Sequence, residues 1–142
     1  MPTVNQLLQN KGFDTITIDP NATVYQALEK IANHRIGSLI VMENGKVVGL
    51  FSERDYARNI ALKGRTSKET SIKEIMSSQL VVVNPEQSIE ECMAIMTDKR
   101  IRHLPVMKDE ELIGIISIGD LVKAIIEEQQ FVIEQLVRYI NS

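Results

Sequence analysis

The chain has 142 residues, of which 44% are hydrophobic and 25% are charged, and its formal net charge at pH 7 is −3. This length supports one compact domain or two fused halves, and the acidic balance argues against binding to nucleic acid or to an anionic membrane surface. The single cysteine excludes an internal disulfide and favours a reducing compartment.

Neither a targeting segment nor a membrane-spanning segment is predicted. The sequence begins Met1-Pro2-Thr3 and continues with a mixed polar segment, which does not fit a signal peptide. No stretch approaches the roughly 18 consecutive apolar residues of a membrane-spanning helix. We therefore expect a cytoplasmic protein with no membrane partner.

The most informative feature is an internal repeat. When the sequence is shifted along itself until Pro20 falls on Pro85, further identical residues superimpose without a gap: Gly49 on Gly114, Ser52 on Ser117 and Asp55 on Asp120. Such self-similarity indicates two copies of one supersecondary unit. We place the first copy, with an N-terminal helix and a linker, in residues 1–68. The second copy, with an extended C-terminal helix, is placed in residues 69–142.

The first copy is predicted to open with a short helix at residues 4–8 and a strand at residues 15–18. A capping box, Thr23-x-x-Gln26, then indicates a helix start. Apolar residues follow at helical spacing: Val24, Ala27, Leu28 and Ile31. Strands at residues 38–42 and 46–51 flank Asn44-Gly45, a strong hairpin signal. A closing helix is expected from Glu53 to about Leu62, and residues 63–68 link the copies.

The second copy repeats this order. We expect a short helix at residues 72–76, a strand at residues 80–83, and strands at residues 103–107 and 112–116. A second capping box, Ser88-x-x-Glu91, precedes a helix whose apolar stripe is Ile89, Cys92, Met93 and Met96. Cys92 is therefore expected to be a small core residue. Each copy reads strand, helix, strand, strand, helix, which predicts an α/β fold.

The closing helix of the second copy, from Ile118 onward, is longer than its counterpart. Beyond Gln129, the counterpart of Gly64, helix-compatible residues continue to Asn141 without Gly or Pro. The apolar stripe of the whole helix is Val122, Ile125, Ile126, Val132, Ile133, Leu136, Val137 and Ile140. The helix either covers its own sheet, pairs with residues 4–8, or crosses to a second subunit. We favour a homodimer, because a self-complementary stripe suits an isologous interface.

A polar Ser-x-x-Asp motif falls at the expected strand-to-helix junction of both copies. Ser52 and Ser117 suit the N-cap, and Asp55 and Asp120 suit the first helical turn, so one interpretation is helix capping alone. The other interpretation is a nucleotide site. A helix N-terminus can bind phosphate, and a carboxylate can accept hydrogen bonds from both hydroxyls of a ribose.

Positive charge is concentrated after the first motif. Between residues 54 and 68 there is one acid, Asp55, and there are five basic residues: Arg54, Arg58, Lys63, Arg65 and Lys68. This segment is interpreted either as a site for a small anion or as a solvated linker.

At this point the chain resembles a tandem pair of cystathionine-β-synthase-type (CBS) domains. The resemblance is carried by His103-Leu104-Pro105-Val106 with Gly114-x-x-Ser117-x-x-Asp120, and by Ser38-Leu39-Ile40-Val41 with Gly49-x-x-Ser52-x-x-Asp55. The first copy departs from the family in having Ile40 where proline is frequent. The resemblance implies two pseudo-twofold-related repeats packed sheet to sheet, with adenosine-containing ligands bound in clefts between them.

The resemblance also implies roles for residues. Asp55 and Asp120 would hold the ribose, the two serines would lie near the phosphate, and the first-strand segments would flank the adenine. Arg102 has Gly37 as its counterpart, so we expect two unequal sites. The complete expected nucleotide-binding set is Thr15, Ile16, Thr17, Gly37, Ser38, Leu39, Ser52, Arg54, Asp55, Arg58, Leu80, Val81, Val82, Arg102, His103, Leu104, Pro105, Ser117, Asp120 and Lys123.

The usual catalytic and metal-binding patterns are missing from the sequence. His34 and His103 have no cysteine or carboxylate at metal-ligand spacing, and neither a P-loop nor a dinucleotide fingerprint occurs. We expect a regulatory sensor, and no enzyme, that binds an adenosyl ligand (AMP, ADP, ATP, NAD(H) or S-adenosylmethionine) without a metal. It would signal in trans to an effector protein. The alternative is an assembly module that dimerises and has vestigial clefts.

Overall fold

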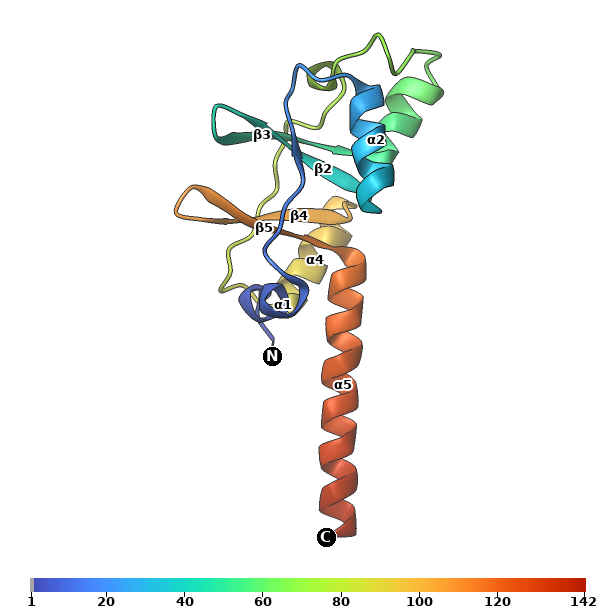
Figure 1. The fold of residues 1–142 in the computed structure, drawn as a ribbon. Helices are drawn as coiled ribbons and strands as arrows, with labels where there is room; N and C mark the ends of the chain where they lie inside the picture. The colour runs from blue at the N-terminus through green and yellow to red at the C-terminus, as the bar shows by residue number, and fades with distance from the viewer. Residues whose placement is uncertain (1) are drawn as a thin grey trace. The chain divides into compact units, whose positions relative to one another are not determined.

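The computed structural model describes residues 2–142, which form two compact units (Figure 1). The repeat-1 unit is Thr15–Val81, and the repeat-2 unit consists of residues 2–14 together with Val82–Ser142. The N-terminal helix, which we expected to accompany the first copy, therefore packs in the unit of the second copy. The repeat boundary at residues 68 and 69 stays a prediction.

The repeat-1 unit is built on a three-stranded sheet. β1 (Thr17–Ile18) lies parallel to β2 (Ser38–Glu43), which pairs antiparallel with β3 (Lys46–Ser52). The apolar stripe of α2 (Val24–His34) is confirmed, because Val24, Ala27 and Ile31 are buried in one core with Phe51 of β3. β3 leads directly into α3 (Glu53–Tyr56). The predicted closing helix from Glu53 is confirmed as far as Ala61, but its second part, η1 (Ala57–Ala61), is π-helical.

The repeat-2 unit pairs two strands and packs three helices. β4 (His103–Lys108) is antiparallel to β5 (Glu111–Ser117), and the helices are α1 (Val4–Lys11), α4 (Ile89–Lys99) and α5 (Ile118–Asn141). Figure 1 shows α5 extending well beyond the other elements of its unit. The predicted core role of Cys92 is confirmed, because its side chain is fully buried with Ile89 and Met96.

The predicted strand at residues 80–83 is wrong except at Val83, which makes a single parallel bridge to Val106. The reason lies in the opposite strand. In the repeat-1 unit, the Ile40 N–H donates to the Ile16 carbonyl over 3.3 Å and extends the parallel pairing. The counterpart of Ile40 is Pro105, which has no N–H to donate. The pairing therefore begins only at Val83, whose N–H donates to the Pro105 carbonyl over 3.1 Å.

Both hairpins close with two residues of positive φ, as a type I′ turn requires. Asn44 (φ 54°) and Gly45 (φ 78°) confirm the predicted turn of the repeat-1 unit. The other hairpin places Asp109 (φ 50°) and Glu110 (φ 67°) in the same conformation, although neither is a glycine. The hairpin geometry is therefore kept in both repeats despite different turn residues.

Helix starts follow the predicted capping boxes with one exception. At Thr23 the reciprocal hydrogen bonds with Gln26 are both present. At Ser88 only half of the box forms: the Glu91 N–H donates to Ser88 Oγ over 3.1 Å, while the Glu91 carboxylate lies 3.3 Å from the same hydroxyl. Glu91 therefore accepts from the serine hydroxyl instead of the serine N–H.

The segment that precedes each repeat in the chain packs on the other repeat. We call residues 2–11 and 69–79 the lead-in segments. In the repeat-1 unit, the Ile72 N–H donates to the Ala22 carbonyl over 2.9 Å and the Lys73 N–H to the Pro20 carbonyl over 2.9 Å. Ile72, in the short 3-10 helix η2 (Ile72–Glu74), is fully buried in this core.

The other lead-in segment makes the same contacts in the repeat-2 unit. The Val4 N–H donates to the Gln87 carbonyl over 2.9 Å, and the Asn5 N–H donates to the Pro85 carbonyl over 2.9 Å. Val4 and Leu8 are fully buried. The segment before the first repeat thus completes the repeat-2 unit, and the segment between the repeats completes the repeat-1 unit.

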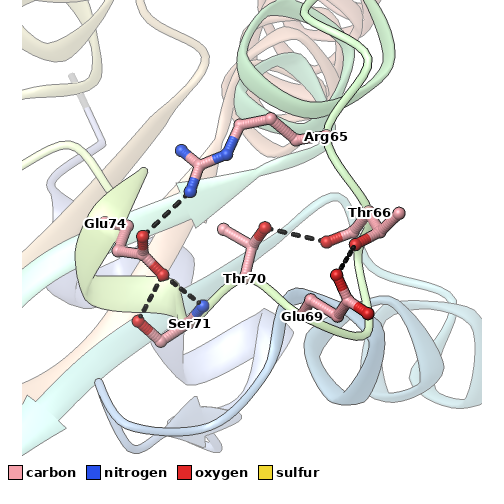
Figure 2. A network of polar contacts seen from close by, with 6 residues as sticks. All are labelled: Arg65, Thr66, Glu69, Thr70, Ser71 and Glu74. Carbon is pink, nitrogen blue, oxygen red and sulfur yellow. Dashed lines mark hydrogen bonds and ion pairs between the residues drawn. The ribbon is translucent and has the colours of Figure 1, made fainter.

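The predicted linker at residues 63–68 is held to the repeat-1 unit by polar contacts (Figure 2). The Arg65 guanidinium lies 2.9 Å from the Glu74 carboxylate, which also accepts from the Ser71 N–H over 2.8 Å. Thr70 is buried and donates to the Thr66 carbonyl over 2.8 Å. These contacts give Arg65 a structural role, which favours the linker interpretation over the anion site for that residue.

The glycine that begins each Gly-x-x-Ser-x-x-Asp motif makes room for a lead-in side chain. A Cβ on Gly114 would lie 2.9 Å from a methyl carbon of Leu8. A Cβ on Gly49 would lie 2.5 Å from the sulfur of Met76 and 3.0 Å from the Ser77 carbonyl oxygen. Leu8 and Met76 therefore occupy the space that a side chain at these positions would need.

We predict that Gly49→Ala lowers the free energy of unfolding by about 1–3 kcal/mol, the usual cost of overpacking a core. The double variant Gly49→Ala/Met76→Ala should regain part of this loss, because it removes the closest contact. Gly119→Ala is the control, since its Cβ would meet only a hydroxyl at 3.6 Å. Urea denaturation measures all three variants, and equal effects of Gly49→Ala and Gly119→Ala would contradict this packing role.

Candidate functional site

The Ser-x-x-Asp motif of the repeat-1 unit closes the junction between β3 and α3. Ser52 ends the strand and caps the helix, and the Asp55 N–H donates to Ser52 Oγ over 3.4 Å. In return, Asp55 Oδ2 accepts from the Ser52 N–H over 2.8 Å and from its hydroxyl over 3.1 Å. Helix capping by this motif is therefore confirmed, and it does not exclude a binding role.

The repeat-2 unit contains the same arrangement between β5 and α5. Asp120 Oδ2 accepts from the Ser117 N–H over 2.8 Å, and the Asp120 N–H donates to Ser117 Oγ over 3.2 Å. These capping bonds use Oδ2, whereas an ionised carboxylate has two oxygens with about four acceptor positions. Capping therefore leaves each aspartate with acceptor capacity in a carboxylate that is held in place.

The fold brings the expected flanking segments of the repeat-1 unit to this junction. Ser38 is opposite Ser52 in the β2–β3 register, and the Glu53 N–H donates to the Gly37 carbonyl over 3.2 Å. Ile16 adjoins β2 through its carbonyl. Leu39 is fully buried, so it can offer a ligand only its backbone.

Corresponding segments meet in the repeat-2 unit. His103 is opposite Ser117 in the β4–β5 register, and the Ile118 N–H donates to the Arg102 carbonyl over 2.9 Å. Leu104 and Pro105 are buried. Val82 is 43% exposed and precedes the single bridge at Val83, whereas Leu80 and Val81 belong to the repeat-1 unit.

Lys11, at the end of α1, is a site residue that the sequence did not predict. Its ammonium lies 2.7 Å from Asp120 Oδ2 and donates to the Ile115 carbonyl over 2.6 Å. Side chains that are far apart in the sequence meet here because the N-terminal lead-in segment packs on the second repeat. No motif in the sequence indicated this pairing.

Comparison with known proteins identifies this architecture. The model of the CBS domain family matches residues 11–62 and 72–127, which together span more than half of the chain. The chain belongs to the CBS domain family. Its two repeats are CBS domains in tandem, as the resemblance in the sequence indicated.

Relatives cover nearly the whole chain. The CBS domain-containing protein CBSX3, mitochondrial, of Arabidopsis thaliana is 37% identical over 149 residues, which span 99% of this chain and 72% of that protein. A solved structure of a protein with CBS domains from Burkholderia ambifaria MC40-6 has a TM-score of 0.86 and 45% identity over 89% of this chain and 96% of that one.

Two further solved structures share the fold. A CBS domain pair in complex with 5′-methylthioadenosine and S-adenosyl-L-methionine has a TM-score of 0.80 at 22% identity, over 90% of this chain and 98% of that one. A hexameric CBS-CP12 protein from bloom-forming cyanobacteria has a TM-score of 0.77 at 29% identity, over 84% and 66%. Because its identity is so low, the first of these shows a common fold and nothing more.

The two CBS aspartates have opposite electrostatic environments. Burial raises the pKa of Asp55 above its ordinary value, although the hydrogen bonds of Ser52 and the charges of Arg58 and Arg54 act against it. Burial acts on the pKa of Asp120 in the same direction, but the hydrogen bond and charge of Lys11, together with the Ser117 bonds, bring it below its ordinary value. The two repeats therefore differ at this position, and the difference comes from Lys11, which had no part in the predicted contrast.

His103, a member of the expected nucleotide-binding set, lies in surroundings that disfavour its charged form. Burial lowers the pKa of His103, the charges of Lys11 and Arg102 lower it further, and Asp120 only partly opposes them. The imidazole is therefore neutral at pH 7. It can donate or accept a hydrogen bond, but it contributes no positive charge.

A cavity of about 340 Å³ adjoins Asp120 in the repeat-2 unit. It lies between α1 and α5 and is lined by Lys11, Lys123 and Asp120, among others. Lys123 and Asp120, both members of the expected nucleotide-binding set, thus line the same cavity. In the repeat-1 unit, a shallower concavity of about 730 Å³ is lined by α2 and by Gly37, Glu53 and Tyr56.

Within residues 2–142, no group of three or more His, Cys, Asp or Glu side chains is arranged to hold a metal ion. In the same range, no helix combines the length and the apolar character needed to cross a membrane. His34 lies exposed at the end of α2.

Opposite pKa shifts predict opposite pH dependence for two matched variants. Ionised Asp120 stabilises the fold above its unfolded pKa, and this contribution is lost as the pH falls through its lower folded pKa. Asp120→Asn should therefore reduce the free energy of unfolding more at pH 7 than near pH 3. Asp55→Asn should show the reverse trend, because the folded state favours protonated Asp55.

Urea denaturation across this pH range, with wild-type protein at each pH as the reference, measures both trends. If the loss of unfolding free energy changed with pH in the same direction in both variants, the opposite electrostatic environments of the two aspartates would be contradicted.

Proposed function

We propose that this CBS pair is a regulatory module that binds an adenosyl nucleotide without transforming it. The observation that carries the proposal is the duplicated Ser-x-x-Asp junction. In each repeat, the capping bonds hold a half-buried carboxylate in place and use one of its two oxygens. A carboxylate held in this way suits the paired hydroxyls of a ribose, since both can donate to it.

The surrounding residues supply the other parts of a nucleotide site. Backbone groups of residues 15–17 and 37–39 in one repeat, and of residues 80–82 and 102–105 in the other, would line the adenine. Ser117 would donate to a phosphate oxygen, and Ser52 would do the same by turning its hydroxyl away from Asp55. Positive charge would come from four residues, Arg54, Arg58, Arg102 and Lys123. AMP, ADP, ATP, NAD(H) and S-adenosylmethionine all satisfy this chemistry, and none of it calls for a metal.

A binding role without catalysis agrees with the state of the one thiol. Burial raises the pKa of Cys92 to about 11, so the thiol is protonated and unreactive at neutral pH. A bound ligand would act by favouring one conformation over another, and an effector protein would respond to it in trans. The cytoplasmic location stays a prediction, and the named Arabidopsis relative is mitochondrial.

Binding can be tested with single-carboxylate variants. Isothermal titration with AMP, ATP, NADH and S-adenosylmethionine should detect a ligand, and a hundredfold excess over Kd should stabilise the protein by about 2.7 kcal/mol. Asp55→Ala and Asp120→Ala should each weaken one binding event by at least about tenfold, because each removes a charge-assisted hydrogen bond. Circular dichroism verifies that each variant is folded, since each also loses part of a cap.

The control for these variants is Asp98→Ala, which removes a carboxylate that is 78% exposed on α4. It should leave binding unchanged. Failure of all four ligands to bind or to stabilise the wild-type protein would contradict the nucleotide proposal and favour the assembly module.

The second candidate function is self-association through α5. The last turns of this helix, residues 131–142, are exposed throughout. Ile126, Ile133 and Ile140 are spaced by seven residues and are 49%, 58% and 76% exposed. Val122, Gln129 and Leu136 form a second seven-residue series four positions away.

This spacing is typical of a coiled-coil seam, in which the two series occupy the a and d positions. A polar residue among them, here Gln129, commonly sets the register of such a helix pair. We propose that a second copy of the chain covers this seam and forms the homodimer predicted from the sequence. An oligomer and a nucleotide site are compatible, so this function adds to the first.

Charges placed in the seam should prevent self-association. Ile133→Lys/Leu136→Lys should reduce the molar mass measured by light scattering to that of a single chain, because two buried ammonium groups per helix cannot be solvated. Glu134→Lys, which lies outside both seven-residue series, is the control and should keep the higher mass. A wild-type protein of single-chain mass would contradict the homodimer.

A further inference from the structure

The ammonium group of Lys11 is held at the second aspartate by two contacts. One is the ion pair with Asp120 Oδ2 at 2.7 Å, and the other is the hydrogen bond to the Ile115 carbonyl at 2.6 Å. The backbone contact does not depend on the charge of Asp120. Because an ammonium group has three N–H donors, one donor remains after these two contacts.

Lys11 distinguishes the two repeats. The lead-in segments correspond in the register that aligns Thr3 with Ser71, since these residues occupy the same place in the two units. In this register, the residue that corresponds to Lys11 is Gln79. The lead-in residue that matches Lys11 is therefore neutral, and its segment is helical only over Ile72–Glu74, whereas α1 is helical to Lys11.

Lys11 and Asp120 both line the cavity next to this ion pair. α1 contributes Lys11 and Asn10 to its lining, and α5 contributes Asp120, Lys123 and Glu127. A phosphate that enters beside an unpaired carboxylate is repelled by it. Repulsion between two like charges at such a short range lowers affinity several-fold.

We propose that Lys11 determines ligand specificity in the second repeat. Its ammonium group cancels the charge of Asp120 and offers its remaining N–H to the ligand, so that this repeat binds adenosine carrying a phosphate in preference to neutral adenosine. This inference rests on the proposed function, because it assumes that Asp120 receives the ribose. It assigns to α1, which lies outside the Ser-x-x-Asp motif, the choice of ligand charge.

A site-resolved titration can test this role. In nitrogen-15 NMR spectra of the full chain, the Ser117 and Asp120 amides report on the second repeat, and the Ser52 and Asp55 amides report on the first. Titration with AMP and with adenosine gives both affinities at each repeat. In Lys11→Gln, the preference for AMP at the second repeat should fall about tenfold, while the first repeat keeps its wild-type preference.

Two matched variants separate charge from structure. Lys11→Arg keeps the positive charge and should keep the preference for AMP. Lys46→Gln removes a positive charge from the hairpin of the repeat-1 unit and should leave the second repeat unchanged.

Three results would overturn the role of Lys11. Equal weakening of AMP and adenosine in Lys11→Gln would assign it a structural role, and tighter AMP binding would show that it blocks the site. Binding of neither compound by the wild-type protein would also overturn it, and the titration with all four ligands then decides whether the nucleotide proposal falls as well. The carboxyl titration of Asp120, followed by carbon-13 NMR in ligand-free protein, distinguishes these failures, because Lys11→Gln should raise its pKa whether or not a nucleotide binds.

Discussion

In each repeat, a hydrogen bond of 2.8 Å from a serine N–H to an aspartate Oδ2 joins the end of a strand to the first turn of a helix. A cap of this kind contributes about 1 kcal/mol, but its main consequence is geometric. It fixes the carboxylate and leaves that group with further acceptor capacity. The flanking strands then place backbone groups beside it, and the lead-in segments pack beneath it against Gly49 and Gly114. Stability and proposed binding therefore use the same residues.

Most of the fold could be predicted from local patterns. Helical spacing identified the buried faces of α2 and α4, and Asn44-Gly45 identified a hairpin, because these signals lie within a few residues of each other. The first strand of the second repeat was overpredicted. Its residues are β-formers, but pairing also depends on the opposite strand, where Pro105 lacks an N–H. Such a long-range requirement is not visible in the segment itself.

The part of the candidate site that depends on local signals was predicted, and the part that depends on long-range contacts was not. The motif residues meet residues 37 and 38 in one unit and residues 102 and 103 in the other, since these positions belong to one hairpin and the helix that follows it. Lys11 was missed because the gapless match of the two motifs aligns it with Met76, whereas the lead-in segments themselves align it with Gln79. The exchange of these segments between the repeats brings the lysine to Asp120. The neutral state of His103 follows from that contact and from burial, which no sequence pattern reports.

The most direct test is a crystal structure of the protein grown with AMP. We predict ribose hydroxyls within hydrogen-bond distance of the carboxylate of Asp55 or Asp120, with the Oδ2 of that residue still accepting from its serine N–H. Nucleotide bound elsewhere on the chain, with both aspartates engaged only in their caps, would show that the motif serves the helix start alone and would contradict the proposed function.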